Sequence, residues 1–358
     1  ESYDFYGQHL TESGDYFYQW TPQGAECDSL VSLHLEIRHI VYVTVGGSGT
    51  KDGRSWANAM DNVQTAINEA SVQAAEFGEC MVWVAKGTYA GNGTSAQAFQ
   101  LKPNVTVMGG FAGNELQGID FDARDFDANE TILTGSHSQR VVGNYGNESA
   151  FSQVNRGYID GFTIKDGYTT GNGGGVYGKN FISVKNCKIY SNQGGKGAGV
   201  YAENRCEITQ CEIYSNTALN DGGGAYCESS TLTYCNIHNN LCDNTASAGQ
   251  QRRGAGIYGK NATVNNCLIA NNSALTEKSF GGGMFIDNSA VQSQLLNCTM
   301  VNNFSYNLGG GVYSVNRGSN NEFINCVLWG NRTLLNDQQV AVSASNVPIY
   351  LRYCAVQG

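Results

Sequence analysis

A short segment recurs along most of this chain, and it constrains the fold more than any other feature. Each copy has an apolar residue, a Cys three positions later, and a second apolar residue two positions after the Cys. Six copies then carry Asn five positions after the Cys. The copies are VKNCKIYSN (184–192), ITQCEIYSN (208–216), LTYCNIHNN (232–240), VNNCLIANN (264–272), LLNCTMVNN (295–303), FINCVLWGN (323–331) and LRYCAV (351–356). An earlier copy, 159–167, fits with Phe162 at the Cys position. Units of about 24 to 32 residues bury an inner face only by stacking on one another.

The apolar spacing within each copy predicts short strands joined by corners. The Cys and the residue two positions later share one face of a strand. The spacing of three before the Cys breaks this alternation, so a bend must lie between. Asn tolerates the left-handed conformation that such a one-residue corner requires. The expected corner residues are Asn186, Gln210, Tyr234, Asn266, Asn297, Asn325 and Tyr353.

The recurring Asn predicts a second stacked column, placed in a turn. Asn side chains can hydrogen-bond the backbone of the next coil and satisfy polar groups buried between layers. We expect a structural role for this column, which comprises Asn192, Asn216, Asn240, Asn272, Asn303 and Asn331.

A Gly-rich strand start follows each Asn, with the pattern Gly-Gly/Ala-Gly, an aliphatic residue and then an aromatic one. The aliphatic residues should point inward: Val176, Val200, Ala225, Ile257, Met284 and Val312. Alternation then places the aromatic residues on the outer face: Tyr177, Tyr201, Tyr226, Tyr258, Phe285 and Tyr313. Beyond them on that face we expect a solvated row of Lys179, Glu203, Glu228, Lys260 and Asp287.

These patterns predict an all-β fold, a right-handed parallel β-helix (solenoid) with three strands and three corners per coil and an N-terminal capping helix. Parallel strands joined in this way almost always wind right-handed. The helix lies within residues 52–78, with Asp61 and Gln64 as a capping box. Its apolar stripe is Val63, Ala66, Ile67, Ala70 and Ala74. Such a helix would cover the open hydrophobic end of the solenoid.

We divide the chain into three parts. Residues 1–39 form an N-terminal surface-module segment, residues 40–135 the N-terminal cap and first coils, and residues 136–358 the β-helix repeats. The chain begins within a structured-looking segment and stops four residues into a new turn. We therefore expect a leader to precede it and the native protein to continue beyond it.

Seven of the twelve cysteines fall in one inward column, where free thiols acting as small apolar residues are expected. No Cys-x-x-Cys or His pairing accompanies them, which argues against a metal site. The others lie outside the column, and whether any pair forms a disulfide stays open: Cys27, Cys80, Cys206, Cys227 and Cys242.

The net charge limits the classes of partner that this chain can bind. The net charge is −10, and the only cluster of basic residues is Arg252–Arg253, so nucleic acid is disfavoured. No apolar run approaches the roughly 18 residues that span a bilayer. We therefore expect no membrane span, and we also expect a monomer.

Several segments resemble known families. SWANAMDNVQTAINEA (55–70), VWVAKGTY (82–89) and VTVMGGFAGNE (105–115) resemble the N-terminal region of secreted β-helix proteins from Bacteroidetes. The Gly-rich and Cys-x-Ile repeats are similar to those of chlamydial polymorphic outer-membrane proteins, where Phe replaces Cys. Residues 6–37 look like a small repeated module of large Bacteroidetes surface proteins. The resemblance implies export to the cell surface and a role in adhesion or glycan contact.

The chain has few residues in catalytic patterns. From residue 159, where the first copy of the repeat begins, the chain has no Asp-Asp pair, no Gly-His-Gly and one histidine, His238. Glycoside hydrolases need paired carboxylates, and polysaccharide lyases need a basic residue, often with Ca²⁺. Stacking could place Glu203 beside Glu228. No protease nucleophile segment or His-Glu-x-x-His is present.

Two features are candidates for ligand binding. The aromatic residues on the outer face either stack as ordinary sheet surface or form a platform for sugar rings, with Glu203 and Glu228 at its edge. The insertions 241–253 and 273–280 leave from the same corner of consecutive coils and should be neighbours. Arg252 and Arg253 would there contact carboxylate or sulfate of an acidic glycan, unless the insertions are tolerated surface variation.

The sequence thus favours a secreted or cell-surface binding or adhesion protein that contacts carbohydrate, or a host surface protein, through the outer face of the β-helix. The alternative is a polysaccharide lyase or glycoside hydrolase of the same fold. A third interpretation is an autotransporter passenger of the immunoglobulin A protease type. No cofactor is expected, apart from Ca²⁺ in the lyase alternative.

Overall fold

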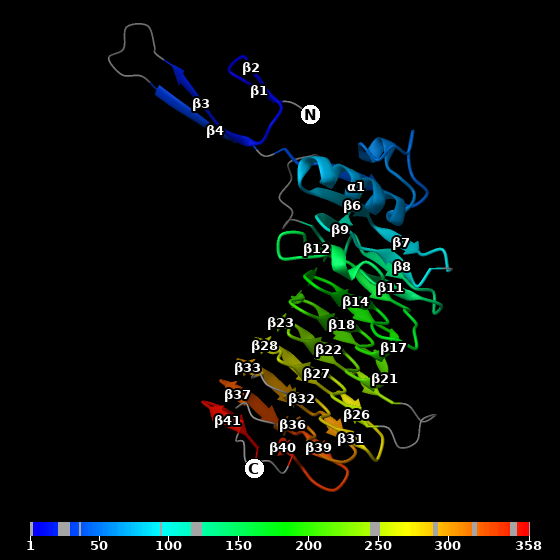
Figure 1. Cartoon of the computed structure of the whole chain (residues 1–358), viewed down its shortest axis with the longest axis vertical. Helices are drawn as coiled ribbons and strands as arrows, with labels where there is room; N and C mark the ends of the chain where they lie inside the picture. The colour runs from blue at the N-terminus through cyan, green and yellow to red at the C-terminus, as the bar shows by residue number, and fades with distance from the viewer. Residues whose placement is uncertain are drawn as a thin grey trace.

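The computed structural model describes residues 3–20, 29–35, 37–93, 95–115, 124–243, 251–288, 293–316, 321–343 and 349–357. From residue 40 onward the chain winds into stacked coils whose strands pair in parallel with the equivalent strands of the coils before and after (Figure 1). The parallel β-helix predicted from the repeats is therefore confirmed.

Four parallel sheets run along the stack. The front sheet faces the viewer in Figure 1 and comprises β8 (Gln97–Gln100), β11 (Arg140–Gly143), β14 (Val176–Lys179), β18 (Val200–Glu203), β22 (Ala225–Glu228), β27 (Ile257–Lys260), β32 (Met284–Asn288), β36 (Val312–Asn316) and β40 (Val340–Val342). The bridging sheet follows it in each coil and comprises β5 (Ile40–Val43), β6 (Cys80–Ala85), β9 (Val105–Phe111), β12 (Gly157–Asp160), β15 (Ile182–Lys185), β19 (Glu207–Thr209), β23 (Thr231–Thr233), β28 (Thr263–Asn265), β33 (Gln294–Leu296), β37 (Asn321–Ile324) and β41 (Ile349–Arg352).

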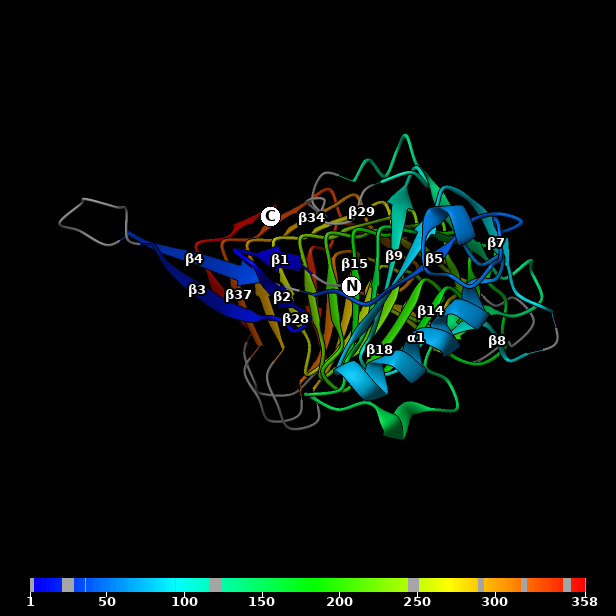
Figure 2. The same cartoon turned by 90° about the horizontal axis from the view of Figure 1, so that it is seen from above.

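The back sheet lies on the far side, as Figure 2 shows from above, where β29 and β34 lie opposite β14 and β18. It comprises β7 (Gly87–Ala90), β10 (Thr131–Thr134), β13 (Thr163–Lys165), β16 (Lys188–Tyr190), β20 (Glu212–Tyr214), β24 (Asn236–His238), β29 (Leu268–Ala270), β34 (Thr299–Val301), β38 (Val327–Trp329) and β42 (Ala355–Val356). The minor sheet returns the chain to the front and comprises β17 (Gln193–Lys196), β21 (Thr217–Asp221), β25 (Leu241–Cys242), β26 (Arg252–Arg253), β30 (Ser273–Ala274), β31 (Ser279–Phe280), β35 (Phe304–Ser305) and β39 (Arg332–Thr333).

The minor sheet corrects the expectation of three strands per coil. The segment between each Asn of the stacked column and the Gly-rich start pairs with its equivalent in the next coil, as Thr217 does with Leu241. Backbone groups that lie in register at the coil spacing form hydrogen bonds even in short segments. The insertions 241–253 and 273–280 contribute strands to this sheet, and Arg252 pairs with Ser279. Their predicted proximity is confirmed, although residues 244–250 lie outside the described part of the chain.

The predicted corners are confirmed at every repeat. All seven residues before the column cysteines have positive φ, between 51° and 55°. The column cysteines point into the core with the aliphatic residues. Among the described residues, the cysteines are free thiols and, except for the partly exposed Cys354, buried. Burial raises the pKa of Cys80 to about 12 and that of Cys206 to about 11. No disulfide therefore joins Cys80, Cys206, Cys227 or Cys242, while Cys27 lies outside the described residues.

The helix α1 (Val63–Phe77) covers the first coil and packs against β5, β6, β8 and β9 (Figure 2). Its buried residues are the five of the predicted stripe. The predicted capping box is wrong, because the N-cap is Asn62, whose side chain accepts the Thr65 N–H at 2.9 Å. Asp61 instead pairs with Lys51 at 2.7 Å.

Short elements complete the described chain. Two antiparallel hairpins precede the solenoid, β1 (Tyr3–Phe5) with β2 (Gln8–Leu10) and β3 (Gly14–Trp20) with β4 (Ser29–Leu35). Figure 1 shows the second hairpin projecting from the helix-capped end. Two 3-10 turns are η1 (Trp56–Asn58) and η3 (Glu148–Ala150).

Candidate functional site

The predicted aromatic residues form a continuous ladder on the outer face of the front sheet. Five consecutive strand pairs set them in register, and Tyr201 pairs directly with Tyr226. The rings from Tyr177 to Phe285 stack nearly parallel, with centroids 4.6 to 5.3 Å apart. We call this set, which Tyr313 completes, the aromatic ladder.

The expectation that these rings are exposed is wrong. Only 6% of Tyr226 is accessible, and the other members except Tyr313 are equally buried. Each ring covers its neighbour, and cationic side chains cover the rest, since Lys196 lies 5.3 Å from the Tyr226 ring and Arg253 lies 5.0 Å from the Tyr258 ring. No ring face from Tyr177 to Phe285 is left for a sugar. The alternative interpretation, that the tyrosines stack as sheet surface, describes what the structure contains.

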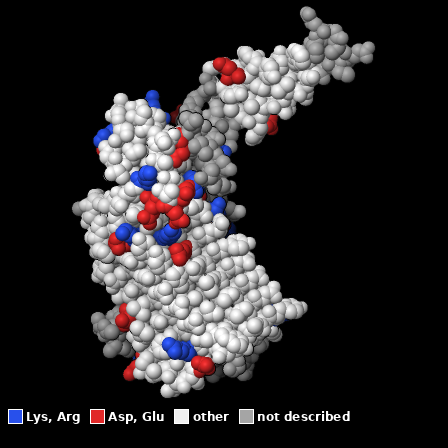
Figure 3. Space-filling view, turned by 180° about the vertical axis from the view of Figure 1, so that it is seen from behind, with Lys and Arg blue, Asp and Glu red and all other residues white. Residues whose placement is uncertain are grey.

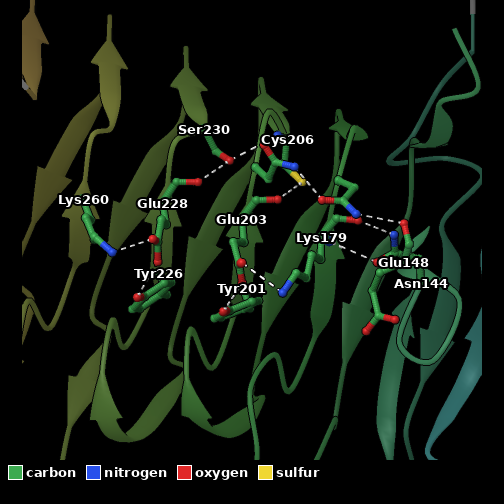
Figure 4. Close-up of polar contacts among 12 residues, drawn as sticks. Asn144, Glu148, Lys179, Tyr201, Glu203, Cys206, Tyr226, Glu228, Ser230 and Lys260 are labelled. Carbon is green, nitrogen blue, oxygen red and sulfur yellow. Dashed lines mark hydrogen bonds and ion pairs between the residues drawn. The ribbon is translucent and has the colours of Figure 1, made fainter. Parts of the chain in front are cut away.

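Charged side chains edge the aromatic ladder (Figure 4). The Tyr201 hydroxyl donates to Glu203 at 2.6 Å, and Lys179 pairs with Glu203 at 3.0 Å. In the same way Tyr226 donates to Glu228, which pairs with Lys260 at 2.6 Å. Burial disfavours the charge of Glu203, but the Tyr201 hydroxyl and the Lys179 ammonium prevail and lower its pKa.

Glu203 and Glu228 are in-register neighbours, as predicted. Each carboxylate forms an ion pair with its own lysine, so the negative charge of each is neutralised by a neighbouring ammonium group. In the described part of the chain, no group of three His, Cys, Asp or Glu side chains is placed to hold a metal ion. A Ca²⁺ site of the lyase type therefore stays a prediction, and the described residues offer no set of ligands for it.

The proposed glycan contact through Arg252 is contradicted. Arg252, on strand β26 of the minor sheet, is fully buried. Arg253 makes a two-pronged ion pair with the buried Asp221, at 2.9 and 2.8 Å, and its guanidinium lies over Tyr258 and Phe285. The two arginines point to opposite faces of β26, Arg252 into the interior and Arg253 toward the aromatic ladder on the outer face. Arg253 therefore joins the minor sheet to the aromatic ladder.

The back sheet carries a second aromatic stack that the sequence analysis missed. Tyr190, Tyr214 and His238 occupy equivalent positions on β16, β20 and β24. Their rings are stacked at 4.9 and 5.1 Å and are only half-buried. The next strand has Ala270 at this position, so no ring from β29 covers the outer side of His238. The signal lies in the sequence, because these residues stand three positions after the repeated Cys, on the strand face opposite to the inward positions.

Charged groups gather beside this stack. Lys188 pairs with Asp127 at 2.6 Å, and His238 with Glu212 at 3.1 Å. The Thr163 hydroxyl donates to Glu130 at 2.8 Å. Hydrogen bonding to Asp127 raises the pKa of Lys188, to which Glu130 and Glu212 contribute. A hollow of about 240 Å³ lies beside them and is bordered by Phe126, Asp127, Thr163, Lys188 and Glu212.

Below the charged region, the back sheet is broad and uncharged. Figure 3 shows charged side chains in the upper half of this face, a wide neutral stretch beneath them, and a few more charged side chains near the lower end. The strands β29, β34 and β38 place Leu268, Thr299 and Val327 in one outer row, and Ala270, Val301 and Trp329 in the other. Trp329 is 54% exposed. This neutral stretch, from His238 to Trp329, is here called the neutral strip.

Comparisons with known proteins identify an architecture. A family model described as "Right handed beta helix region" matches residues 146–328. No curated protein matches the chain significantly. Similar solved structures include pectate lyase Pel9A, at 15% identity and a TM-score of 0.39, covering 86% of this chain and 68% of that one.

Two further solved structures are similar at the same level. The tailspike protein gp49 of Acinetobacter baumannii bacteriophage Fri1, a capsular polysaccharide depolymerase, has 14% identity and a TM-score of 0.42, covering 94% of this chain and 60% of that one. The A-module of the Azotobacter vinelandii mannuronan C-5 epimerase AlgE4 has 13% identity and a TM-score of 0.35, covering 88% and 100%. Similarity at this level carries no activity or ligand over to this chain. Among the described residues, no helix has the length and apolarity to cross a membrane.

Proposed function

This chain belongs to the right-handed β-helix family, and from that premise we propose that it is a surface protein that binds polysaccharide along the neutral strip. The carrying observation is the exposed Trp329 at one end of the strip and the half-buried rings of Tyr214 and His238 at the other. Three strand spacings, about 14 Å, separate these ends. A glycan chain lying along the helix axis would meet an aromatic group at each end.

The chemistry of the neutral strip supports this ligand class. An indole offers a large apolar face with a polar edge, which suits the C–H face of a sugar ring and its hydroxyls. Thr299 offers a neutral hydrogen-bonding group between the ends, and Asn236 offers another beside His238 on β24. The aromatic ladder lacks both features, because its rings are covered. We therefore propose that the aromatic surface that contacts sugar lies on the back sheet and not on the front sheet, where the sequence predicted it.

Affinity electrophoresis through gels cast with different polysaccharides tests the proposal. We expect at least one polysaccharide to retard the protein, and Trp329→Ala to weaken binding about tenfold, or 1.4 kcal/mol. Trp20→Ala is the matched control, because Trp20 is equally exposed, at 53%, but lies on the hairpin strand β3. This control should be retarded like the parent protein.

Each other outcome has a meaning. If no polysaccharide retards the protein, or if Trp329→Ala and Trp20→Ala behave alike, the neutral strip is not a glycan site. A cleared zone in the gel would instead support the lyase or hydrolase alternative, and the hollow beside Lys188 and Glu212 would be the place to seek the catalytic groups.

We further propose the setting. Export, adhesion at a cell surface and kinship with Bacteroidetes surface proteins rest on the sequence resemblances given above, and we propose a monomeric state alongside them. We also propose the division of the chain into residues 1–39, 40–135 and 136–358, which rests on the sequence alone.

A further inference from the structure

A large polar hollow lies at the corner where the front sheet passes into the bridging sheet. It has a volume of about 860 Å³ and is bordered by successive coils. Phe181, Arg205 and Ser229 come from three consecutive corners between β14 and β15, β18 and β19, and β22 and β23. Arg156, which precedes β12, closes one side. We call this the corner hollow.

Two guanidinium groups share one aromatic ring in the corner hollow. Arg156 lies 5.8 Å and Arg205 5.7 Å from the centroid of Phe181. Cation–π contact with the ring holds each planar group in place. Residues 180 and 181, and 204 and 205, have left-handed backbones, which turn these side chains outward at the corner.

The charges of the corner hollow do not balance. Arg156 pairs with Glu207 at 2.7 Å. Arg205 donates one long hydrogen bond, 3.5 Å, to Gln153, and in the described part of the chain it has no ion pair. Glu207 is the one acidic residue that borders the hollow. Two guanidinium groups therefore face one carboxylate, in a chain whose net charge is −10.

Neutral donors complete the lining. Thr231 and Thr263 bring hydroxyl groups from consecutive strands of the bridging sheet, and Asn204 brings an amide. The Ser229 hydroxyl accepts a hydrogen bond from Asn261 at 3.0 Å, which leaves its own proton available for donation. Hydroxyl donors beside an unpaired guanidinium make a site suited to the oxygens of an anionic group.

We propose that the corner hollow binds the carboxylate or sulfate group of an acidic oligosaccharide. Arg205 contacts the anion with its planar fork, and the hydroxyls of Ser229, Thr231 and Thr263 contact the sugar. Glu207 competes with the ligand for Arg156. The corner hollow and the neutral strip lie on different sides of the bridging sheet, so this binding is independent of the function proposed above.

Isothermal titration with three probes tests the proposal: a galacturonate trimer, a sulfated dextran oligomer and a neutral dextran oligomer. The first two separate carboxylate from sulfate as the preferred anion. Any binding of the neutral oligomer would belong to the neutral strip and should be unchanged by Arg205→Ala. We expect Arg205→Ala to weaken binding of the preferred probe about tenfold. Lys86→Ala removes an equal charge from an exposed side chain elsewhere and should leave the affinity unchanged.

A second variant separates a built site from general attraction of anions. Glu207→Gln frees Arg156 and should tighten binding severalfold, whereas Glu76→Gln, on an exposed face of α1, should not. The proposal is overturned if neither anionic probe binds, or if Arg205→Ala and Lys86→Ala weaken binding equally. Trp329→Ala should bind the anionic probe normally, so loss of the neutral strip and loss of the corner hollow give different results.

Discussion

The asparagine at each turn joins three successive coils. The Asn240 side chain accepts from the Asn216 N–H at 3.1 Å and from the Asn216 Nδ2 at 3.0 Å, and it donates to Ile213 O and to Asn272 Oδ1. The same contacts recur from Asn192 to Asn331. The third glycine of the Gly-rich start makes room for this ladder, since a Cβ on Gly224 would lie 2.8 Å from the Asn240 Nδ2.

Replacing one rung tests this account. Asn240→Ala leaves buried donors and acceptors in two neighbouring coils without partners, each of which costs about 1–3 kcal/mol. We expect the free energy of unfolding to fall by roughly 2–4 kcal/mol in urea titrations. Asn68→Ala, on the exposed side of α1, should change it by less than about 0.5 kcal/mol. Equal effects of the two substitutions would contradict the role of the ladder.

At the scale of the strand, the tyrosines of the aromatic ladder donate hydrogen bonds to the carboxylates along the edge of the front sheet. Burial, together with the neighbouring carboxylates, raises the pKa of Tyr201, Tyr226 and Tyr258. The neutral hydroxyl is therefore favoured in the folded state, where it donates to Glu203, Glu228 or Asp287. Deprotonation is easier in the unfolded chain, whose tyrosines ionise near pH 10.

This raised pKa predicts the pH dependence of stability. The folded-state pKa lies above the unfolded value, so the stabilisation is complete below about pH 10 and is lost as the pH rises beyond it. The urea midpoint should fall steeply above that pH. The double variant Tyr226→Phe/Tyr258→Phe should show a shallower fall, whereas Tyr234→Phe, at an exposed corner, should follow the parent protein. An unchanged slope in the double variant would refute this assignment.

At the scale of the whole molecule, α1 protects the end of a continuous core. The apolar interior runs from Val63 and Ile67 of α1 through the column cysteines to Leu328. Each coil contacts mainly its neighbours, so the first coil depends on the helix for burial.

Truncating the helix contact tests the cap. Ile67→Ala removes a fully buried side chain and should lower stability by about 2–5 kcal/mol. Hydrogen exchange should then accelerate first in β5, β6 and β9, the strands beneath the helix. Val72→Ala, on the exposed side of the same helix, is the control. Uniform acceleration along the solenoid would mean that the coils unfold together and that the cap has no local role.

The sequence by itself determined the repeat, the corners, the inward cysteines and the asparagine ladder. These features depend on alternation and on backbone conformation at single positions, and both are readable within one coil. It also indicated the covering helix, though not its N-cap, because Asp61 and Asn62 are both suitable capping residues.

Only the tertiary structure decided which outer side chains are accessible. Stacking at the coil spacing covers the aromatic ladder, and the minor sheet buries Arg252, although both looked exposed one coil at a time. The candidate sites join residues far apart in the chain, Asp127 with Lys188 and Arg156 with Arg205. Periodicity predicts whether a side chain points into or out of its own coil. A site on a solenoid also depends on the contacts between stacked coils and between the segments that connect them.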